Sequence, residues 1–198
     1  MGCQLSAETC LNRPASIWCV PTLNAERHAM QNHLKEILLA LAKAKVEFVV
    51  AGGVAVVLHG VERLTLDLDL ALKMTKENLE QFLQTIHKLG LQPRIPVNPE
   101  SLTDPEAVQR IVREKGALVF SFVDLNQPIR QLDVFLTKEL SYDELAQDAF
   151  AIELDGKRIK IASLEKMLEI KKGIGSPREK DLMDIRELER LKQQKNVG

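Results

Sequence analysis

The stretch from Ala51 to Leu70, AGGVAVVLHGVERLTLDLDL, constrains the fold of this chain more than any other segment. It follows VEFVV, a nearly all-apolar run that predicts a short strand buried on both faces. Two glycines come next, and GVAVVLHG then predicts a short helix that ends at Gly60. Asp67 and Asp69 alternate with leucines, which is the pattern of a second strand. The stretch therefore predicts a strand–turn–helix–strand unit with carboxylates among apolar residues.

Asp67 and Asp69 are expected to emerge side by side, because residues i and i+2 of a strand point to the same face. Two carboxylates at that distance repel each other, and one takes up a proton unless a cation lies between them. Mg²⁺ prefers oxygen ligands and often binds one or two carboxylates together with substrate phosphates. Taken alone, however, the Asp-x-Asp pattern is more typical of an exposed polar face on a half-buried strand.

Two further features raise the weight of the metal interpretation. Gly52 and Gly53 allow a close backbone approach to a ligand, and the N–H groups of the helix that follows suit a phosphate. The pair alone is also consistent with a tight strand-to-helix turn. Asp133, in IRQLDVFL, is again a carboxylate flanked by apolar residues on a predicted strand. If that strand neighbours the first, three carboxylates converge on two metal ions, an arrangement that supports in-line displacement at phosphorus.

The rest of the chain predicts helices and strands in alternation. Helices are expected in NAERHAMQNHLKEILLALAKAK, in TKENLEQFLQTIHKLG and around residues 106–115, and a proline-rich loop is expected between residues 91 and 105. Two antiparallel hairpins would turn at residues 126–128 and 155–156. Two closing helices would begin near Ser163 and at Ser176, where SPRE resembles a capping box.

These elements predict an α/β (α+β) fold, a single mixed sheet flanked by helices with a C-terminal helical pair. We expect one domain over residues 24–198, preceded by an N-terminal extension, residues 1–23, with little ordered structure. That extension holds Cys3, Cys10 and Cys19, whose spacing contains no CxxC, so a zinc site or a disulfide framework is not expected. No apolar run reaches the ~20 residues needed to cross a bilayer, and we expect a cytoplasmic protein.

The overall charge argues against a general attraction to nucleic acid. The chain has a net charge of −1, with 27 Lys and Arg against 28 Asp and Glu. An RNA contact would need a local basic patch. The candidates are scattered over three predicted elements: Arg110, Arg113, Lys115, Arg130, Lys157, Arg158 and Lys160.

The motifs together resemble a known superfamily. AGGVAVVLHGVERLTLDLDL looks like the signature of the DNA polymerase beta-like nucleotidyltransferases, and thirteen residues separate Gly53 from Asp67. The finer pattern G-G-x-A-x-x-L-H-G-x-x-R-x-T-x-D-x-D-L is similar to bacterial stand-alone nucleotidyltransferases of the abortive-infection toxin type. Asp133 resembles the third carboxylate of that superfamily. The segment LEKMLEIKKGIGSPREKDLMDIREL resembles the closing motif of these proteins.

The resemblance implies a Mg²⁺-dependent transfer of a nucleoside monophosphate from an NTP to an acceptor hydroxyl, with two metal ions and Mn²⁺ as the alternative metal. The catalytic and metal-binding residues it implies are Asp67, Asp69 and Asp133. The nucleotide-binding residues it implies are Gly52, Gly53, Arg63, Lys171, Lys180 and Asp184, with Lys172 as the alternative to Lys171. We expect Thr65 to buttress the strand, and His59 to form a local hydrogen bond rather than to act as a base.

The acceptor is left open by the sequence: a tRNA, a protein or a small molecule such as an antibiotic would each fit. By analogy, the resemblance implies a toxin with an antitoxin partner. The alternative from a different class is a catalytically inactive module of the same fold that binds nucleotide or a partner protein. Its main weakness is that all three carboxylates are present. A purely structural module would leave the glycines and the three aspartates as unrelated coincidences.

Overall fold

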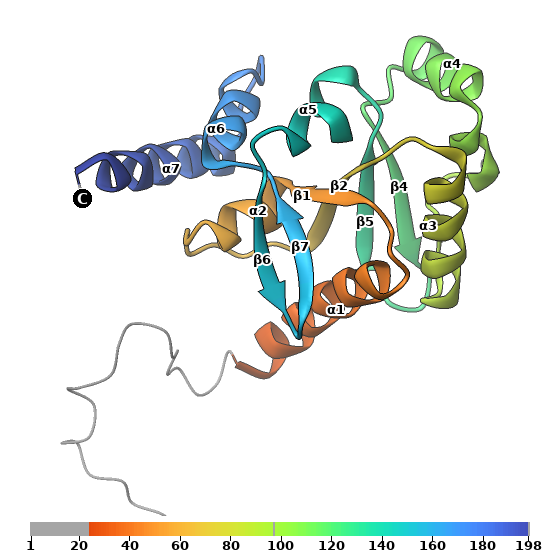
Figure 1. Cartoon of the computed structure of the whole chain (residues 1–198), viewed down its shortest axis with the longest axis horizontal. Coiled ribbons are helices and arrows are strands. Elements are labelled where there is room, and N and C mark those ends of the chain that lie inside the picture. The colour runs from red at the N-terminus through yellow and green to blue at the C-terminus, as the bar shows by residue number, and fades with distance from the viewer. Residues whose placement is uncertain (1–23, 97, 198) are drawn as a thin grey trace, which may run out of the picture.

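The computed structural model describes residues 24–96 and 98–197, and the predicted N-terminal extension with its three cysteines lies outside these ranges. The described residues form one mixed sheet of seven strands with helices on both sides (Figure 1). The strands are β1 (Phe48–Ala51), β2 (Asp67–Leu72), β3 (Leu91–Pro93), β4 (Val119–Asp124), β5 (Gln131–Phe135), β6 (Phe150–Leu154) and β7 (Lys157–Ile161). The α-helices are α1 (Asn24–Lys43), α2 (Gly52–Leu58), α3 (Lys76–Lys88), α4 (Pro105–Lys115), α5 (Tyr142–Ala146), α6 (Leu164–Lys172) and α7 (Glu179–Val197). Two 3-10 helices, η2 (Pro99–Thr103) and η3 (Lys138–Leu140), complete the set.

The strand order is β3-β4-β5-β2-β1-β7-β6, so β2 lies in the middle of the sheet. It pairs with β5 in parallel and with β1 antiparallel, while β1 and β7 form a second parallel pair. The predicted α/β fold with a mixed sheet is confirmed. Because β2 and β5 are parallel neighbours, polar residues at matching positions on these strands are brought next to each other.

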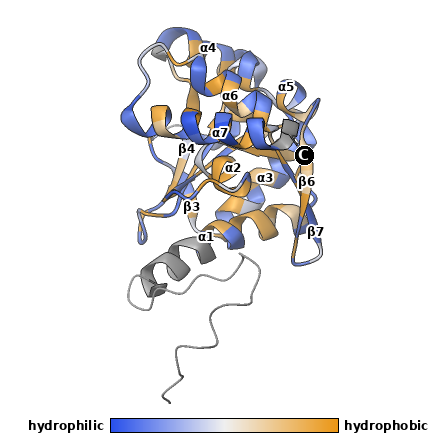
Figure 2. Ribbon diagram, turned by 90° about the vertical axis from the view of Figure 1, so that its left-hand side faces the viewer, coloured by the Kyte–Doolittle hydropathy of each residue, from blue (hydrophilic) through white to orange (hydrophobic). Residues whose placement is uncertain are grey.

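The hydrophobic core lies between the sheet and the helices. Leu68, Leu70, Leu132 and Val134, which alternate with the aspartates of β2 and β5, are fully buried and belong to this core. The ribbon of α2 is hydrophobic along most of its length, whereas polar and apolar residues alternate along α7 (Figure 2). In Figure 1, α6 and α7 lie to the left of the sheet and α3 and α4 to its right. None of the described helices is long and apolar enough to cross a membrane.

Both predicted hairpins form. β4 pairs antiparallel with β5, and β6 pairs antiparallel with β7. The turn between β6 and β7 places Asp155 at φ 47° and Gly156 at φ 73°, the positive values that a two-residue hairpin turn requires. The Asp-Gly pair in the sequence therefore predicted this turn correctly.

Two local predictions were wrong. The segment predicted as a loop between residues 91 and 105 contains the short strand β3, which pairs with β4 at the edge of the sheet. The last helix begins at Glu179 and not at Ser176. There the Asp181 carboxylate accepts a hydrogen bond from the backbone N–H of Arg178 (3.2 Å), and the Arg178 carbonyl accepts the first helical bonds. The helix start is thus fixed by a side chain that reaches back from inside the helix.

Candidate active site

The three predicted catalytic aspartates lie together on the central strands. Asp69 on β2 is paired in register with Asp133 on β5, and Asp67 lies two residues before Asp69 on the same face. One carboxylate oxygen from each of the three residues lies within 4.8 Å of the others. The convergence expected from the sequence is therefore present, and the parallel pairing of β2 with β5 produces it.

Gly52 is required by the closeness of the backbone to Asp69. Its φ is +58°, and a Cβ built on it would overlap the Asp69 carboxylate and lie 2.8 Å from Asp69 Cβ. The next residue, Gly53, directs its backbone N–H toward Asp69 Oδ2 at 3.4 Å. A Cβ on Gly53 would overlap Thr65 Oγ1 and lie 3.1 Å from an Arg63 guanidinium nitrogen. Both glycines thus leave room for the side chains that build the site.

The electrostatics of the three carboxylates favour a bound cation. Burial, followed by the charges of Asp67 and Asp133, raises the pKa of Asp69 from 3.8 to about 6, although the Gly53 N–H and Lys171 oppose this shift. Among the described residues, no Lys, Arg or His forms an ion pair with any of the three. A set of carboxylate oxygens with mutual repulsion and no ion-pair partner among the described residues fits a hard divalent cation such as Mg²⁺.

Two neutral side chains orient the carboxylates. The Thr65 hydroxyl donates to Asp67 Oδ1 at 3.3 Å, in agreement with its predicted role beside the strand. The Gln131 amide donates to both carboxylate oxygens of Asp133, at 3.2 and 3.1 Å. Gln131 was not singled out from the sequence. Gln131 lies two residues before Asp133 on the same face of the strand, and this spacing could have indicated a contact between the two side chains.

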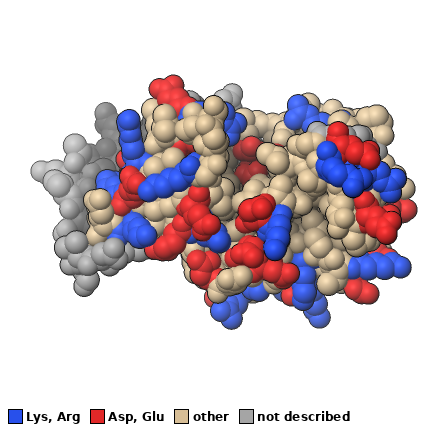
Figure 3. Space-filling model, turned by 90° about the horizontal axis from the view of Figure 1, so that it is seen from above, with Lys and Arg blue, Asp and Glu red and all other residues tan. Residues whose placement is uncertain are grey.

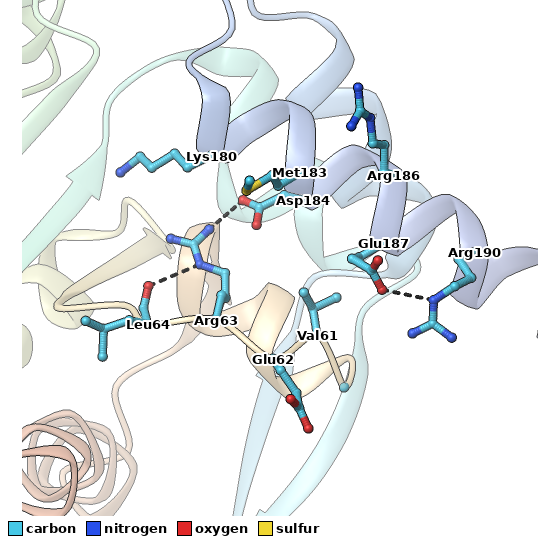
Figure 4. Close-up of a pocket in the computed structure, with 11 residues that line it drawn as sticks. Val61, Glu62, Arg63, Leu64, Lys180, Met183, Asp184, Arg186, Glu187 and Arg190 are labelled. Carbon is cyan, nitrogen blue, oxygen red and sulfur yellow. Dashed lines mark hydrogen bonds and ion pairs between the residues drawn. The ribbon is translucent and has the colours of Figure 1, made fainter. Parts of the chain in front are cut away.

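Three of the predicted nucleotide-binding residues line one open groove of roughly 700 Å³ (Figure 4). Arg63, Lys180 and Asp184 lie on opposite walls: Arg63 on the segment that leads into β2, and the other two on α7. The Arg63 guanidinium forms an ion pair with Asp184 at 2.5 Å. Lys180 is exposed and pairs with no acidic group of the described residues. In Figure 4 its side chain extends away from α7 and lies above Arg63 in the view.

Lys171 on α6 is buried and bound to two aspartates of α7. Its ammonium lies 2.8 Å from Asp181 Oδ1 and 2.7 Å from Asp184 Oδ2. Lys172, the alternative considered from the sequence, instead pairs with Glu189 at 2.6 Å and is half exposed. Asp184 therefore joins both Arg63 and Lys171, and it connects the groove to the interior.

Asp181 completes this network. It accepts from Lys171 and also from Arg178, whose Nε lies 3.0 Å from Asp181 Oδ2. Burial opposes ionisation of Asp181, but the hydrogen bonds from Lys171 and Arg178 outweigh it and lower the pKa of Asp181 to about 2. Asp181 was assigned no role from the sequence. Its part in the network depends on the packing of α6 against α7, which no local pattern reports.

The side chains of two other candidates, His59 and Arg130, bind other parts of the fold. A His59 ring nitrogen lies 2.9 Å from the Ala162 carbonyl, so His59 is hydrogen-bonded as expected, although to a residue far along the chain. Arg130, a candidate for a basic surface, is buried and pairs with Asp124 and Glu36, and it is therefore removed from any such patch. On the face shown in Figure 3, basic and acidic groups are interspersed.

Comparisons with known proteins identify the family. Residues 33–188 match the aminoglycoside-2''-adenylyltransferase family. A comparison with curated proteins found no match. Among solved structures, the lincomycin-bound lincosamide antibiotic adenylyltransferase LnuA is similar, with a TM-score of 0.55 and 17% identity over 81% of this chain and 97% of that one. The solution structure of the antibiotic-resistance factor ANT(2'')-Ia gives a TM-score of 0.51 and 15% identity over 86% of this chain and 92% of that one.

The two structures support the fold, and the family match covers most of the chain. The expected nucleotidyltransferase superfamily is thereby confirmed, as is the expectation that the protein is an enzyme of that kind. Neither the family nor these two structures bears on the toxin role, which stays a prediction. The carboxylates on β2 and β5 and the two glycines that begin α2 agree with the family match over residues 33–188: the chain belongs to the aminoglycoside-2''-adenylyltransferase family of nucleotidyltransferases.

Proposed function

We propose that this protein transfers AMP from ATP to a hydroxyl group of a small antibiotic, with an aminoglycoside as the first acceptor to test. The observation that carries the proposal is the cluster of Asp67, Asp69 and Asp133, which forms no ion pair with any described residue and lies beside Gly52. The family match supports an adenylyl group and an aminoglycoside acceptor. The net charge of −1 and the interspersed charges on the face shown in Figure 3 favour a small molecule over a nucleic acid.

The reaction proposed is an in-line displacement at the α-phosphorus of ATP. The acceptor oxygen forms a bond to this phosphorus, the bond to the bridging oxygen of pyrophosphate breaks, and the acceptor hydroxyl loses its proton. The residues that would hold divalent metal are Asp67, Asp69 and Asp133. Bound Mg²⁺ supplies charge neutralisation at the triphosphate and makes the attacking hydroxyl more acidic.

The residues of the chain contribute position and charge. Asp133, held by the Gln131 amide, is the proposed group that receives the proton of the acceptor hydroxyl. Lys171 and Arg63 are the proposed phosphate-binding cations, since both bind the same carboxylate, Asp184, and Arg63 also lies near Gly53. The backbone at Gly52 and Gly53 is the proposed contact to the phosphates, and Lys180 is proposed to contact the nucleotide from α7.

The test is a transfer assay with α-³²P-labelled ATP, GTP, CTP and UTP in the presence of Mg²⁺. Separate reactions contain an aminoglycoside, a lincosamide, total tRNA or whole-cell protein. The proposal predicts label from ATP in an antibiotic. Label in tRNA or protein instead would overturn the acceptor and favour the toxin-like role, whereas nucleotide binding with no transfer to any acceptor would favour an inactive binding module.

A further inference from the structure

Asp184 is buried between the two cations proposed to bind phosphate. Its side chain is 4% exposed, and it lies 2.5 Å from an Arg63 guanidinium nitrogen and 2.7 Å from the Lys171 ammonium. Arg63 comes from the segment before β2 and Lys171 from α6, so the two residues belong to parts of the chain far apart in sequence. One carboxylate oxygen, Oδ2, serves both contacts.

The Asp184 carboxylate is connected to the aspartate cluster through Arg63 and Gly53. A Cβ on Gly53 would be 3.1 Å from an Arg63 guanidinium nitrogen, and the Gly53 N–H is directed toward Asp69 Oδ2 at 3.4 Å. Arg63 therefore lies near Gly53, which borders the cluster, and also binds Asp184 on α7, an approach that Figure 4 shows. A small displacement of Asp184 would be transmitted to Arg63 directly.

We infer that Asp184 is a positioning residue that sets the separation of Arg63 and Lys171, so that the two cations meet a triphosphate as one unit. This inference rests on the proposed function, and it assigns Asp184 an action through two other side chains in place of direct nucleotide contact. An anionic carboxylate that is already paired with two cations is poorly suited to accept a phosphate itself.

Asp181 supports the arrangement from the other side of Lys171. It holds the ammonium at 2.8 Å while its second oxygen accepts from Arg178, and its side chain is 1% exposed. The two aspartates together leave Lys171 little freedom to move. The network thus links the start of α7 to the cation of α6, and docking of α7 fixes the cation pair.

The test measures ATP binding by calorimetry in Mg²⁺ for the full chain and for three variants. Asp184→Asn removes the charge and Asp184→Glu moves it by one methylene, and each is expected to raise the Kd for ATP about tenfold or more, because one positioned charge-assisted hydrogen bond is lost. Glu189→Gln is the matched control: it removes the exposed Lys172–Glu189 pair that joins the same two helices. Its Kd is expected to stay within about twofold of the wild type.

The melting temperature of each variant separates positioning from a structural role. If Asp184 only holds the helices together, folded Asp184→Glu binds ATP as the wild type does, and the inference is wrong. Tighter binding by Asp184→Asn would also overturn it, since Asp184 would then compete with phosphate. In an Arg63→Gln background, Asp184→Asn is expected to have a smaller effect than in the wild type. Wild-type protein that binds no ATP would instead overturn the proposed function.

Discussion

Gly52 and Asp69 lie so close that the carboxylate occupies the space a Cβ on Gly52 would need. The first residue of α2 and the central strand β2 thus pack closely against each other at this point. From the sequence, Gly52 was expected to allow the backbone to approach a ligand closely. The structure adds a second reason, which is room for the aspartate itself.

Gly52→Ala is therefore expected to reduce adenylyl transfer by about 100-fold or more, because the Asp69 carboxylate must move, and a misplacement of about 1 Å can have such an effect. Gly116→Ala is the matched control, since Gly116 has φ +59°, close to the +58° of Gly52, and a Cβ there meets nothing within 4 Å. Both variants bear the backbone cost, about 1–2 kcal/mol. Equal activities of the two variants would show that backbone strain alone explains the loss.

Asp69 should make stability depend on pH in metal-free protein. Its pKa of about 6 is above the ordinary value of 3.8, so between these values the unfolded chain releases a proton that the folded protein retains. Stability from this group is complete below pH 3.8 and is lost as the pH rises through about 6.

In EDTA, Asp69→Asn is expected to be more stable than the wild type at pH 7.5, by at most about 3 kcal/mol, and equally stable below pH 4. Mg²⁺ should stabilise the wild type and leave the variant unchanged. Urea unfolding at several pH values measures both effects. A variant less stable than the wild type at pH 7.5 in EDTA would mean that the Asp69 carboxylate is already compensated within the protein.

Asp181 should show the opposite dependence. Its pKa of about 2 is below the usual 3.8, so its contribution is complete above pH 3.8 and is lost as the pH falls toward 2. Asp181→Asn is expected to lower the free energy of unfolding at pH 7 by roughly 3–5 kcal/mol, because it leaves Lys171 buried with less counter-charge. The difference in the free energy of unfolding between Asp181→Asn and the wild type should become smaller as the pH falls toward 2. Glu187→Gln, which removes an exposed pair with Arg190, is expected to cost less than about 1 kcal/mol at either pH.

Gln131 should matter for turnover more than for folding. Gln131→Leu removes both hydrogen bonds to Asp133, so the carboxylate gains freedom to rotate, and kcat is expected to fall about tenfold with a nearly unchanged melting temperature. Gln127→Leu changes an exposed residue in the turn of the same hairpin and serves as the control. A normal kcat for Gln131→Leu would show that Gln131 does not position Asp133 for the reaction.

The parts of the site that the sequence predicted are those set by local geometry. Alternation on β2 places Asp67 and Asp69 on one face, and a similar alternation marked Asp133 on its own strand. Residues that depend on contacts between distant elements were missed or given a different role. The position of Asp184 between Arg63 and Lys171 requires α7 to pack on α6 and face the segment before β2, which no periodicity reports.

The errors in the predicted fold also arise from contacts between distant parts of the chain. The strand β3 has three residues, two of them Gln92 and Pro93, and it forms because β4 offers an open edge to pair with. The start of α7 at Glu179 depends on Asp181, which both receives the Arg178 N–H and is held by Lys171. Ser176 and Pro177 before it are typical of a helix start, but the contact of Asp181 with Lys171 favours a start at Glu179 instead.

The most direct measurement is the mass of an aminoglycoside after incubation with ATP and the protein, with Mg²⁺ or with EDTA, beside the Asp67→Asn/Asp69→Asn double variant. We expect addition of one AMP unit, with release of pyrophosphate, only by the wild type in Mg²⁺. Equal modification by the double variant, or by the wild type in EDTA, would contradict the assignment of these carboxylates to a metal-dependent transfer.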